Sequence, residues 1–241
     1  MTNSDQPIIN PGQGIFKIRV AERIIFVPVG VCLRLLALRL RAKKTKKRAY
    51  PAQIYRLKEE KEINLAGPAM GAPVAGMVLE QLIAGGARRI IFIGLAGAIS
   101  PNLDIGDLLL VNEAISDEGT SKDYFPEKNP PRADDQLFSR LNQELEKTKK
   151  KFKIGKVATI DAFFRETPKK IKQFQNQGAI AVEMELSALY TIARFRKVAL
   201  AGMVIISDEH KDNQWKTGFT SPKLLSSLID AGKIARKVLS Q

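Results

Sequence analysis

Three carboxylates interrupt apolar stretches in the C-terminal third of the sequence. Glu183 and Glu185 lie within AVEMELSALY, and Asp208 follows the apolar run VALAGMVIIS. The chain has a net charge of +14, so these acids are not part of a general acidic surplus. Burying a carboxylate costs free energy unless a partner binds it. The three side chains are therefore candidates for a site.

The two glutamates lie where an expected strand passes into an expected helix. Their side chains should project in different directions there, so one of them is enough to face a ligand. A carboxylate at such a position can accept hydrogen bonds from two neighbouring hydroxyls, which is what a ribose 2′,3′-diol offers. The alternative is structural, because an acid at a helix N-terminus is stabilised by the helix dipole. The residues alone leave both interpretations open.

Asp208 ends an expected buried strand, where an aspartate suits a general acid, although a turn or cap role is the alternative. His210 is the only histidine, and a lone histidine beside a turn is usually a surface residue. With this histidine and a single cysteine, Cys32, the sequence lacks a Ser-His-Asp triad and a zinc-binding cluster. We therefore predict no metal site. Phe163 follows a strand end and could form an apolar wall for a flat ring or pack in the core.

These candidate residues can form one site only if the strands that carry them end close together. Short apolar runs alternate with amphipathic stretches, a pattern typical of a largely parallel sheet covered by helices. We predict one α/β domain. The expected strands cover 23–29, 53–57, 63–67, 89–94, 107–114, 155–160, 178–183 and 198–207, and the expected helices cover 32–41, 72–85, 133–149, 168–177, 185–196 and 222–239.

Two expected strands end in glycine-containing turns. The strand RRIIFIG runs into LAGA, and EINLAG is followed by PAMGAP at the start of a helix. Ligands of open α/β sheets bind outside the carboxyl ends of the strands, and glycine lets backbone N–H groups approach an anion. A turn or packing role for these glycines is the alternative.

Positive charge is concentrated in two runs, RLRAKKTKKR at 39–48 and KTKKKFKIGK at 147–156. Such runs can bind nucleic acid or acidic lipid, but the first lacks the aromatic side chains on which single strands stack. We interpret both runs as solvated loops and helix ends. A single cysteine fits a reducing cytoplasm, and the longest apolar stretches are too short, or too interrupted by arginine, to cross a membrane. We therefore expect a cytoplasmic protein without a membrane or nucleic-acid partner.

Five segments occur in a fixed order along the chain. They are AGPAMGAPVAGMVLEQLIAGGARRIIFIGLAGAI, IGDLLLVNEAISDEGTS, ATIDAFFRET, AVEMELSALYTIA and MVIISDE. Together they resemble the nucleoside phosphorylase superfamily, which includes hexameric purine nucleoside phosphorylases, uridine phosphorylases and methylthioadenosine/adenosylhomocysteine nucleosidases. The chain looks like a divergent member over roughly residues 20–240. The resemblance implies a three-layer α/β/α sandwich with a mixed, largely parallel sheet, formed by a domain over 19–241 after a flexible segment over 1–18.

The resemblance also implies roles for individual residues. Met184 and Glu185 resemble the family's ribose-binding pair, with Glu185 receiving the sugar hydroxyls. Phe163 takes the place of the aromatic side chain that packs on the nucleobase, and Arg165 is a further candidate for binding substrate. Asp208 resembles the acid that protonates a purine at N7, which favours a purine substrate.

The expected phosphate site departs from the family pattern. Gly30 and Arg34 resemble the first phosphate-loop residues, and Gly94 resembles the glycine of the second anion-binding turn. Where phosphorolytic relatives usually carry an arginine and a hydroxyl residue around that turn, this chain has Phe92 and Leu95. Neither side chain can grip phosphate as a guanidinium and a hydroxyl do.

The resemblance implies a nucleoside phosphorylase, a pentosyltransferase of nucleotide salvage that converts a purine nucleoside and phosphate into free base and ribose 1-phosphate. Inorganic phosphate is the expected co-substrate, and no other cofactor is expected. A nucleosidase that uses water is the alternative, and a non-catalytic polyanion-binding member is the second. The family usually assembles as dimers that associate further, so a homo-oligomer such as a hexamer is expected.

Overall fold

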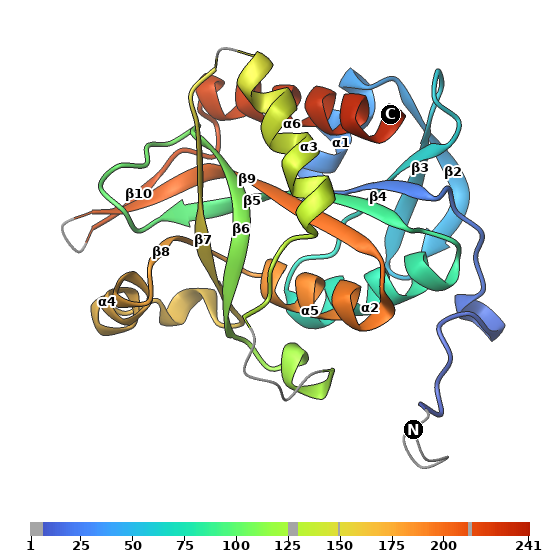
Figure 1. The fold of residues 1–241 in the computed structure, drawn as a ribbon, viewed down its shortest axis with the longest axis horizontal. Helices are drawn as coiled ribbons and strands as arrows, with labels where there is room; N and C mark the ends of the chain where they lie inside the picture. The colour runs from blue at the N-terminus through green and yellow to red at the C-terminus, as the bar shows by residue number, and fades with distance from the viewer. Residues whose placement is uncertain (1–6, 125–129, 149, 212–213) are drawn as a thin grey trace.

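The computed structural model describes residues 7–124, 130–148, 150–211 and 214–241 (Figure 1). Its helices are α1 (Gly30–Arg39), α2 (Ala72–Ala84), α3 (Asp135–Lys147), α4 (Pro168–Asn176), α5 (Leu186–Arg196) and α6 (Pro222–Ser240), with short 3₁₀ turns η2 (Gly14–Phe16), η3 (Thr120–Asp123) and η4 (Phe163–Arg165). Its strands are β1 (Arg23–Phe26), β2 (Ala42–Ala49), β3 (Ala52–Leu57), β4 (Ile63–Gly67), β5 (Arg89–Ala98), β6 (Leu108–Asp117), β7 (Phe152–Ile160), β8 (Ala179–Glu183), β9 (Ala199–Lys211) and β10 (Gln214–Thr217).

Within the described residues the strands form one ten-stranded sheet in the order β10-β9-β6-β7-β8-β5-β1-β4-β3-β2. Strand β9 also pairs with β5, in parallel over most of its length. Since β5 pairs with β8 as well, strands β5, β9, β6, β7 and β8 close into a barrel. Strands β1, β4, β3 and β2 extend from β5 as an open sheet.

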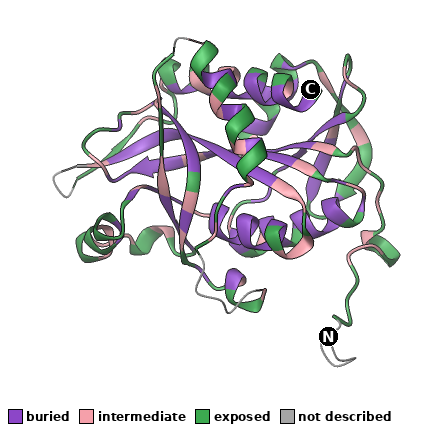
Figure 2. Cartoon of the chain, viewed as in Figure 1, coloured by how far each residue is buried: buried purple, intermediate pink, exposed green. Residues whose placement is uncertain are grey.

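Helices cover both faces of this sheet. In Figure 1, α1, α3 and α6 lie above it and α2 and α5 lie below, while α4 lies beside β8. Figure 2 shows that the central strands are buried, and the outward sides of the helices are exposed. The predicted three-layer α/β/α arrangement with a mixed sheet is confirmed.

Helix α3 illustrates how the sequence pattern gives this packing. Leu137, Leu141 and Leu145 recur every four residues, and all three are buried. The Asp134 carboxylate accepts a hydrogen bond from the Leu137 N–H at 2.9 Å and so caps the first turn. Apolar periodicity and the cap residue therefore predict this helix correctly.

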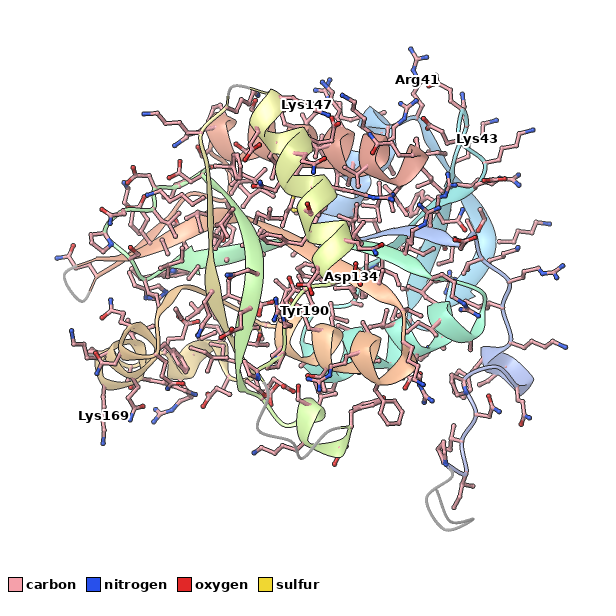
Figure 3. The ribbon with its side chains drawn as sticks, in the orientation of Figure 1. Arg41, Lys43, Asp134, Lys147, Lys169 and Tyr190 are labelled. Carbon is pink, nitrogen blue, oxygen red and sulfur yellow. The ribbon has the colours of Figure 1, made fainter. Side chains whose placement is uncertain are left out.

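The interpretation of residues 39–48 as loop and helix end is wrong for most of the run. Residues 42–49 form β2 at the edge of the sheet, antiparallel to β3. Figure 3 shows the nearby Arg41 and Lys43 pointing away from the sheet. Lysines discourage an edge strand from pairing with another chain. Whether this basic edge also binds a polyanion stays a prediction.

Strand β10 was also missed from the sequence, and β9 runs beyond its expected end at residue 207. The two strands form an antiparallel pair in which Trp215 lies opposite His210 and Thr217 lies opposite Asp208. All four β10 residues are exposed, so their side chains carry no alternating apolar pattern. The strand is set by its pairing with β9, which sequence periodicity does not reveal.

Candidate active site

A cavity of about 430 Å³ opens where β1, β5, β8 and β9 end. Its wall is largely apolar, with side chains from the start of α1, from η4 and from the start of α6. The polar part of the wall comprises four acids, Glu166, Glu183, Glu185 and Asp208, together with the hydroxyl residue Ser207. Within the described part of the chain, no lysine, arginine or histidine lines this cavity. The size suits a small organic ligand, and the charges suit a ligand that is positive or becomes positive during reaction.

Glu183 stabilises the start of α5 through hydrogen bonds. Its Oε2 accepts hydrogen bonds from the backbone N–H of Glu185 at 2.7 Å and of Leu186 at 2.8 Å, and its Oε1 accepts one from the Thr159 hydroxyl. The Thr159 oxygen in turn accepts from the Ser187 N–H at 2.9 Å. Burial raises the pKa of Glu183. The structural alternative, an acid at a helix N-terminus, thus describes this glutamate.

Glu185 has a different set of contacts. The residue is 4% exposed, and its Oε1 accepts a hydrogen bond from the Gly71 N–H at 2.6 Å. Gly71 has φ 85, in the left-handed region that favours glycine, and it precedes α2. Burial and the neighbouring Glu183 charge raise the pKa of Glu185. A carboxylate has about four lone-pair sites, so this buried acid retains capacity for hydroxyl donors from a ligand beside its backbone donors.

Asp208 lies near the C-terminal end of β9, on a different strand from the two glutamates, and is 3% exposed. Its Oδ1 accepts a hydrogen bond from the Ser207 hydroxyl at 2.6 Å, and its Oδ2 accepts one from the Trp215 indole N–H at 2.8 Å. Trp215 belongs to β10, so the strand that was missed from the sequence positions the candidate acid. Ser207 and Asp208 both line the cavity.

The expectation that His210 is a surface residue is wrong. Its side chain is 20% exposed, and its Nε2 lies 2.9 Å from Glu166 Oε2 and 3.7 Å from Asp208 Oδ2. Contact with Glu166 raises the pKa of His210. Residues two apart on a strand face the same side, so extending β9 past Asp208 would have predicted this neighbourhood.

Gly97 lies against the side chains of Asp208 and His210, where a larger residue would crowd them. A Cβ at position 97 would lie 2.9 Å from Asp208 Oδ2 and 3.3 Å from His210 Nε2. The Asp208 carboxylate is the movable end of a side chain, so it would shift while the backbone stays in place. A glycine in β5 is therefore required for the placement of the acid rather than for the turn expected from the sequence.

We expect Gly97→Ala to lower kcat/KM for the protein's substrate by about 10- to 100-fold, since a displacement of about 1 Å in a reacting group has effects of this size. The thermal unfolding midpoint should change little. Gly119→Ala is the matched control, because the nearest atom to its Cβ would be Asp161 Oδ2 at an ordinary 3.9 Å. Equal kinetics for the parent protein and Gly97→Ala would contradict this role.

The aromatic candidate lies at the cavity. Phe163 is half-buried in η4 and lines the wall together with Met184. Its ring contacts Phe164 edge-on, with centroids 5.2 Å apart, and Trp215 with centroids 6.0 Å apart. The structure thus brings Phe163, Met184, Glu185 and Asp208 together, as the sequence analysis expected. Their roles toward a ligand stay predictions.

The expected anion-binding residues are placed differently. Arg34 and Arg165 are exposed, and neither lines the cavity. Gly30 begins α1, and Val31 after it lines the cavity. Gly94 is packed against the Phe92 ring, which a Cβ at 94 would approach to 2.5 Å. Phosphate binding by Gly30, Arg34 and Gly94, and substrate binding by Arg165, therefore stay predictions without a cavity contact to support them.

Phe92 and Leu95, the departures around the second glycine turn, have separate places. Phe92 is fully buried and packs edge-on against Phe26, with ring centroids 6.2 Å apart. Leu95 lines the cavity. One substitution therefore fills the core, and the other makes the cavity wall apolar.

Two features of the described residues bear on other classes of site. No group of three or more histidine, cysteine, aspartate or glutamate side chains is arranged to hold a metal ion there. No helix in the same ranges combines the length and the apolar character that a membrane span requires.

Known proteins resemble this chain along most of its length. The sequence model of the phosphorylase superfamily matches residues 23–239. Over 150 residues the chain is 31% identical to the DeoD-type purine nucleoside phosphorylase of Exiguobacterium sp., covering 61% of this chain and 63% of that protein. Over 147 residues it is 26% identical to the guanosine phosphorylase of Halorubrum lacusprofundi, covering 61% of each. The alignments thus span less than two thirds of these relatives.

Solved structures share the fold. Purine nucleoside phosphorylase from Toxoplasma gondii superposes with a TM-score of 0.82 at 20% identity, covering 91% of this chain and 90% of that one. AMP nucleosidase from Bacteroides thetaiotaomicron superposes with a TM-score of 0.76 at 20% identity, covering 92% and 90%. At these identities the likeness supports the architecture alone, and the chemistry has to come from the cavity.

Proposed function

The chain belongs to the phosphorylase superfamily, and from this premise we propose that its cavity cleaves the N-glycosidic bond of a purine-type nucleoside. The observation that carries the proposal is the placement of two buried acids, Glu185 and Asp208, on one cavity of about 430 Å³. They come from different strand ends and have different donors, which suits different parts of a ligand.

In this proposal each cavity residue has a defined part. Glu185 accepts hydrogen bonds from the ribose 2′- and 3′-hydroxyls, and Met184 packs against the sugar. Phe163 packs on the base, and Asp208 is the general acid that donates a proton to purine N7. The bond between C1′ and N9 then breaks, and its electron pair stays on the base, which leaves as a neutral purine.

The acidic wall supports the charge that develops in this reaction. As the base departs, positive charge builds up on the ribosyl ring, and fixed carboxylates in a buried cavity stabilise it. Glu183 and Glu185 lie at the end of β8 that lines the cavity, and because burial raises the pKa of both, they carry this negative charge only at a pH above the ordinary titration range of a glutamate. The same charges disfavour a phosphate dianion in the cavity.

We infer that water is the nucleophile. The absence of a cationic side chain from the described cavity lining, together with Leu95 in the wall, favours water over phosphate. The water oxygen bonds to C1′, its released proton passes to a cavity carboxylate, and the products are free base and ribose. A carboxylate whose pKa is raised by burial is a suitable acceptor near neutral pH.

We expect base release to proceed without phosphate. The rate with a purine ribonucleoside should change less than twofold between phosphate-free buffer and about 50 mM phosphate, because no side chain of the described cavity lining is a cation that could hold the anion. Base release is followed by absorbance, and the sugar product is identified as ribose or ribose 1-phosphate. Strict dependence on phosphate, with ribose 1-phosphate as product, would contradict water as nucleophile.

Phosphorolysis is the second candidate, and two observations favour it. The curated relatives named above are phosphorylases. Helix α1 begins at Gly30 without a side-chain cap, and Val31 and Cys32 of its first turn line the cavity, so free backbone N–H groups are available for an anion. The phosphate experiment separates the two candidates. Assembly into a homo-oligomer stays a prediction.

A further inference from the structure

Glu166 lies at the junction of two cavities. It lines the candidate active site and also a second cavity of about 450 Å³ between α4 and the β9–β10 hairpin. Phe163 and Phe164 are likewise shared by both cavities, while Lys172, His210 and Trp215 line only the second. The two spaces are therefore adjacent compartments with Glu166 in their common wall.

The Glu166 carboxylate is buried and incompletely satisfied. Its side chain is 6% exposed, and among the described residues Oε2 accepts no directed hydrogen bond. His210 Nε2 lies 2.9 Å away as an ion-pair partner, but no hydrogen bond of good geometry joins the two atoms. The buried carboxylate therefore keeps capacity to accept a hydrogen bond from a ligand N–H. No step of the proposed reaction uses Glu166.

Glu166 and Asp208 lie close to each other. One imidazole nitrogen, Nε2 of His210, is 2.9 Å from Glu166 Oε2 and 3.7 Å from Asp208 Oδ2. Both carboxylates line the candidate active site. Two neighbouring acids can therefore contact two neighbouring groups on one edge of a base.

A purine offers two such neighbouring groups. Adenine presents N7 as an acceptor beside its 6-amino donor, whereas guanine presents N7 beside a 6-oxo acceptor. With N7 toward Asp208, the substituent at C6 lies toward Glu166. A carboxylate accepts a hydrogen bond from an amino group, whereas it repels a carbonyl oxygen.

We propose that Glu166 recognises the 6-amino group of the base, so that the substrates are 6-aminopurine nucleosides, and that the second cavity receives a substituent on that nitrogen. This inference rests on the proposed glycosidic cleavage. A nitrogen bearing one substituent still has one N–H for Glu166. The aromatic rings of Phe164 and Trp215 give the second cavity apolar surface for an alkyl or aryl group.

The test compares kcat/KM for adenosine, inosine and N6-benzyladenosine in the parent protein and in Glu166→Gln. The parent should prefer adenosine over inosine by about 10- to 100-fold. Glu166→Gln should bring this ratio close to one, because an amide can accept from the amino group and donate to the carbonyl. N6-benzyladenosine should keep at least about a tenth of the adenosine value in the parent.

Glu113→Gln is the matched control, since Glu113 pairs with Lys156 and lines neither cavity. Its adenosine-to-inosine ratio should equal that of the parent. An inosine preference in the parent, or equal losses on both substrates in Glu166→Gln, would overturn recognition by Glu166. Loss of N6-benzyladenosine turnover alone would overturn the role of the second cavity. Failure of the parent to release base from any nucleoside would instead overturn the proposed function.

Discussion

Asp208→Asn should lower kcat on a purine nucleoside by about 10²- to 10⁴-fold, the usual contribution of a general acid. The asparagine amide keeps the size of the side chain and an oxygen for the Trp215 N–H, but it has no proton to transfer. KM should stay within a few-fold, because the sugar contacts of Glu185 are unchanged. Steady-state kinetics of base release measure both quantities.

A substrate that needs no acid separates proton transfer from positioning. The p-nitrophenolate of p-nitrophenyl β-riboside is a stable anion that leaves without a proton, so the variant should retain most of its activity on this compound. Asp135→Asn, at an exposed position on α3, is the surface control. Equal losses on both substrates would mean that Asp208 only orients the ligand, and full activity on both would remove it from the site.

The elements with strong local signals were predictable from the sequence. Helix α3 has both apolar spacing and a capping aspartate, and the acids in and just after the apolar runs of β8 and β9 stand out from their surroundings. Strand β2 was hidden because lysines, which are poor strand formers, occupy a solvent-facing edge. Strand β10 depends on pairing with β9, a tertiary contact that has no local signature.

The division of roles between Glu183 and Glu185 also required the structure. Both acids have the same local sequence context, yet Glu183 is fixed by N–H groups of the following helix and Glu185 by the N–H of Gly71, which is 114 residues away. The sequence did not mark Glu166 as a site candidate, because it follows a short 3₁₀ turn within a polar stretch. Its importance depends on burial between two cavities, which is a property of the fold.

The arginines show how little a motif says about the position of a side chain in space. The resemblance implies that Arg34 and Arg165 belong to the site, and this assignment stays a prediction. In the structure both side chains are exposed, while Val31 and Phe163 nearby line the cavity. A long cationic side chain remains in water unless a buried partner compensates its desolvation.

Glu185→Gln should lower kcat/KM on a ribonucleoside by about 10²- to 10⁴-fold. Two hydrogen bonds from hydroxyls to an ionised carboxylate are worth about 1.5–3 kcal/mol each, and each 1.4 kcal/mol is tenfold. The parent should also discriminate against a 2′-deoxynucleoside, and this discrimination should largely disappear in the variant, because the lost hydroxyl no longer has a charged partner. The glutamine oxygen can still accept from Gly71, so the fold is retained.

The same residue should set a pH dependence. Burial and the Glu183 charge raise the pKa of Glu185, so kcat/KM on the ribonucleoside should rise with pH through a midpoint above the ordinary value of 4.5. A raised pKa means that the folded protein binds this proton more tightly than the unfolded chain, so ionisation removes stability as pH increases. Glu185→Gln should therefore gain thermal stability over the parent at pH 8 more than at pH 5.

A buried glutamate outside the cavity distinguishes these effects from general damage to the fold. Glu80 pairs with Arg196 at 2.9 Å between α2 and α5, and it lines neither cavity. Glu80→Gln should lower the unfolding temperature, because it leaves a partly buried guanidinium without its charge partner, yet it should keep the parent's ratio of ribonucleoside to 2′-deoxynucleoside turnover. If Glu80→Gln lost that ratio while Glu185→Gln kept it, the sugar-binding role would belong elsewhere. The opposite pattern would tie the ribose hydroxyls to Glu185, since only a carboxylate in contact with the sugar changes substrate preference while making the folded protein more stable.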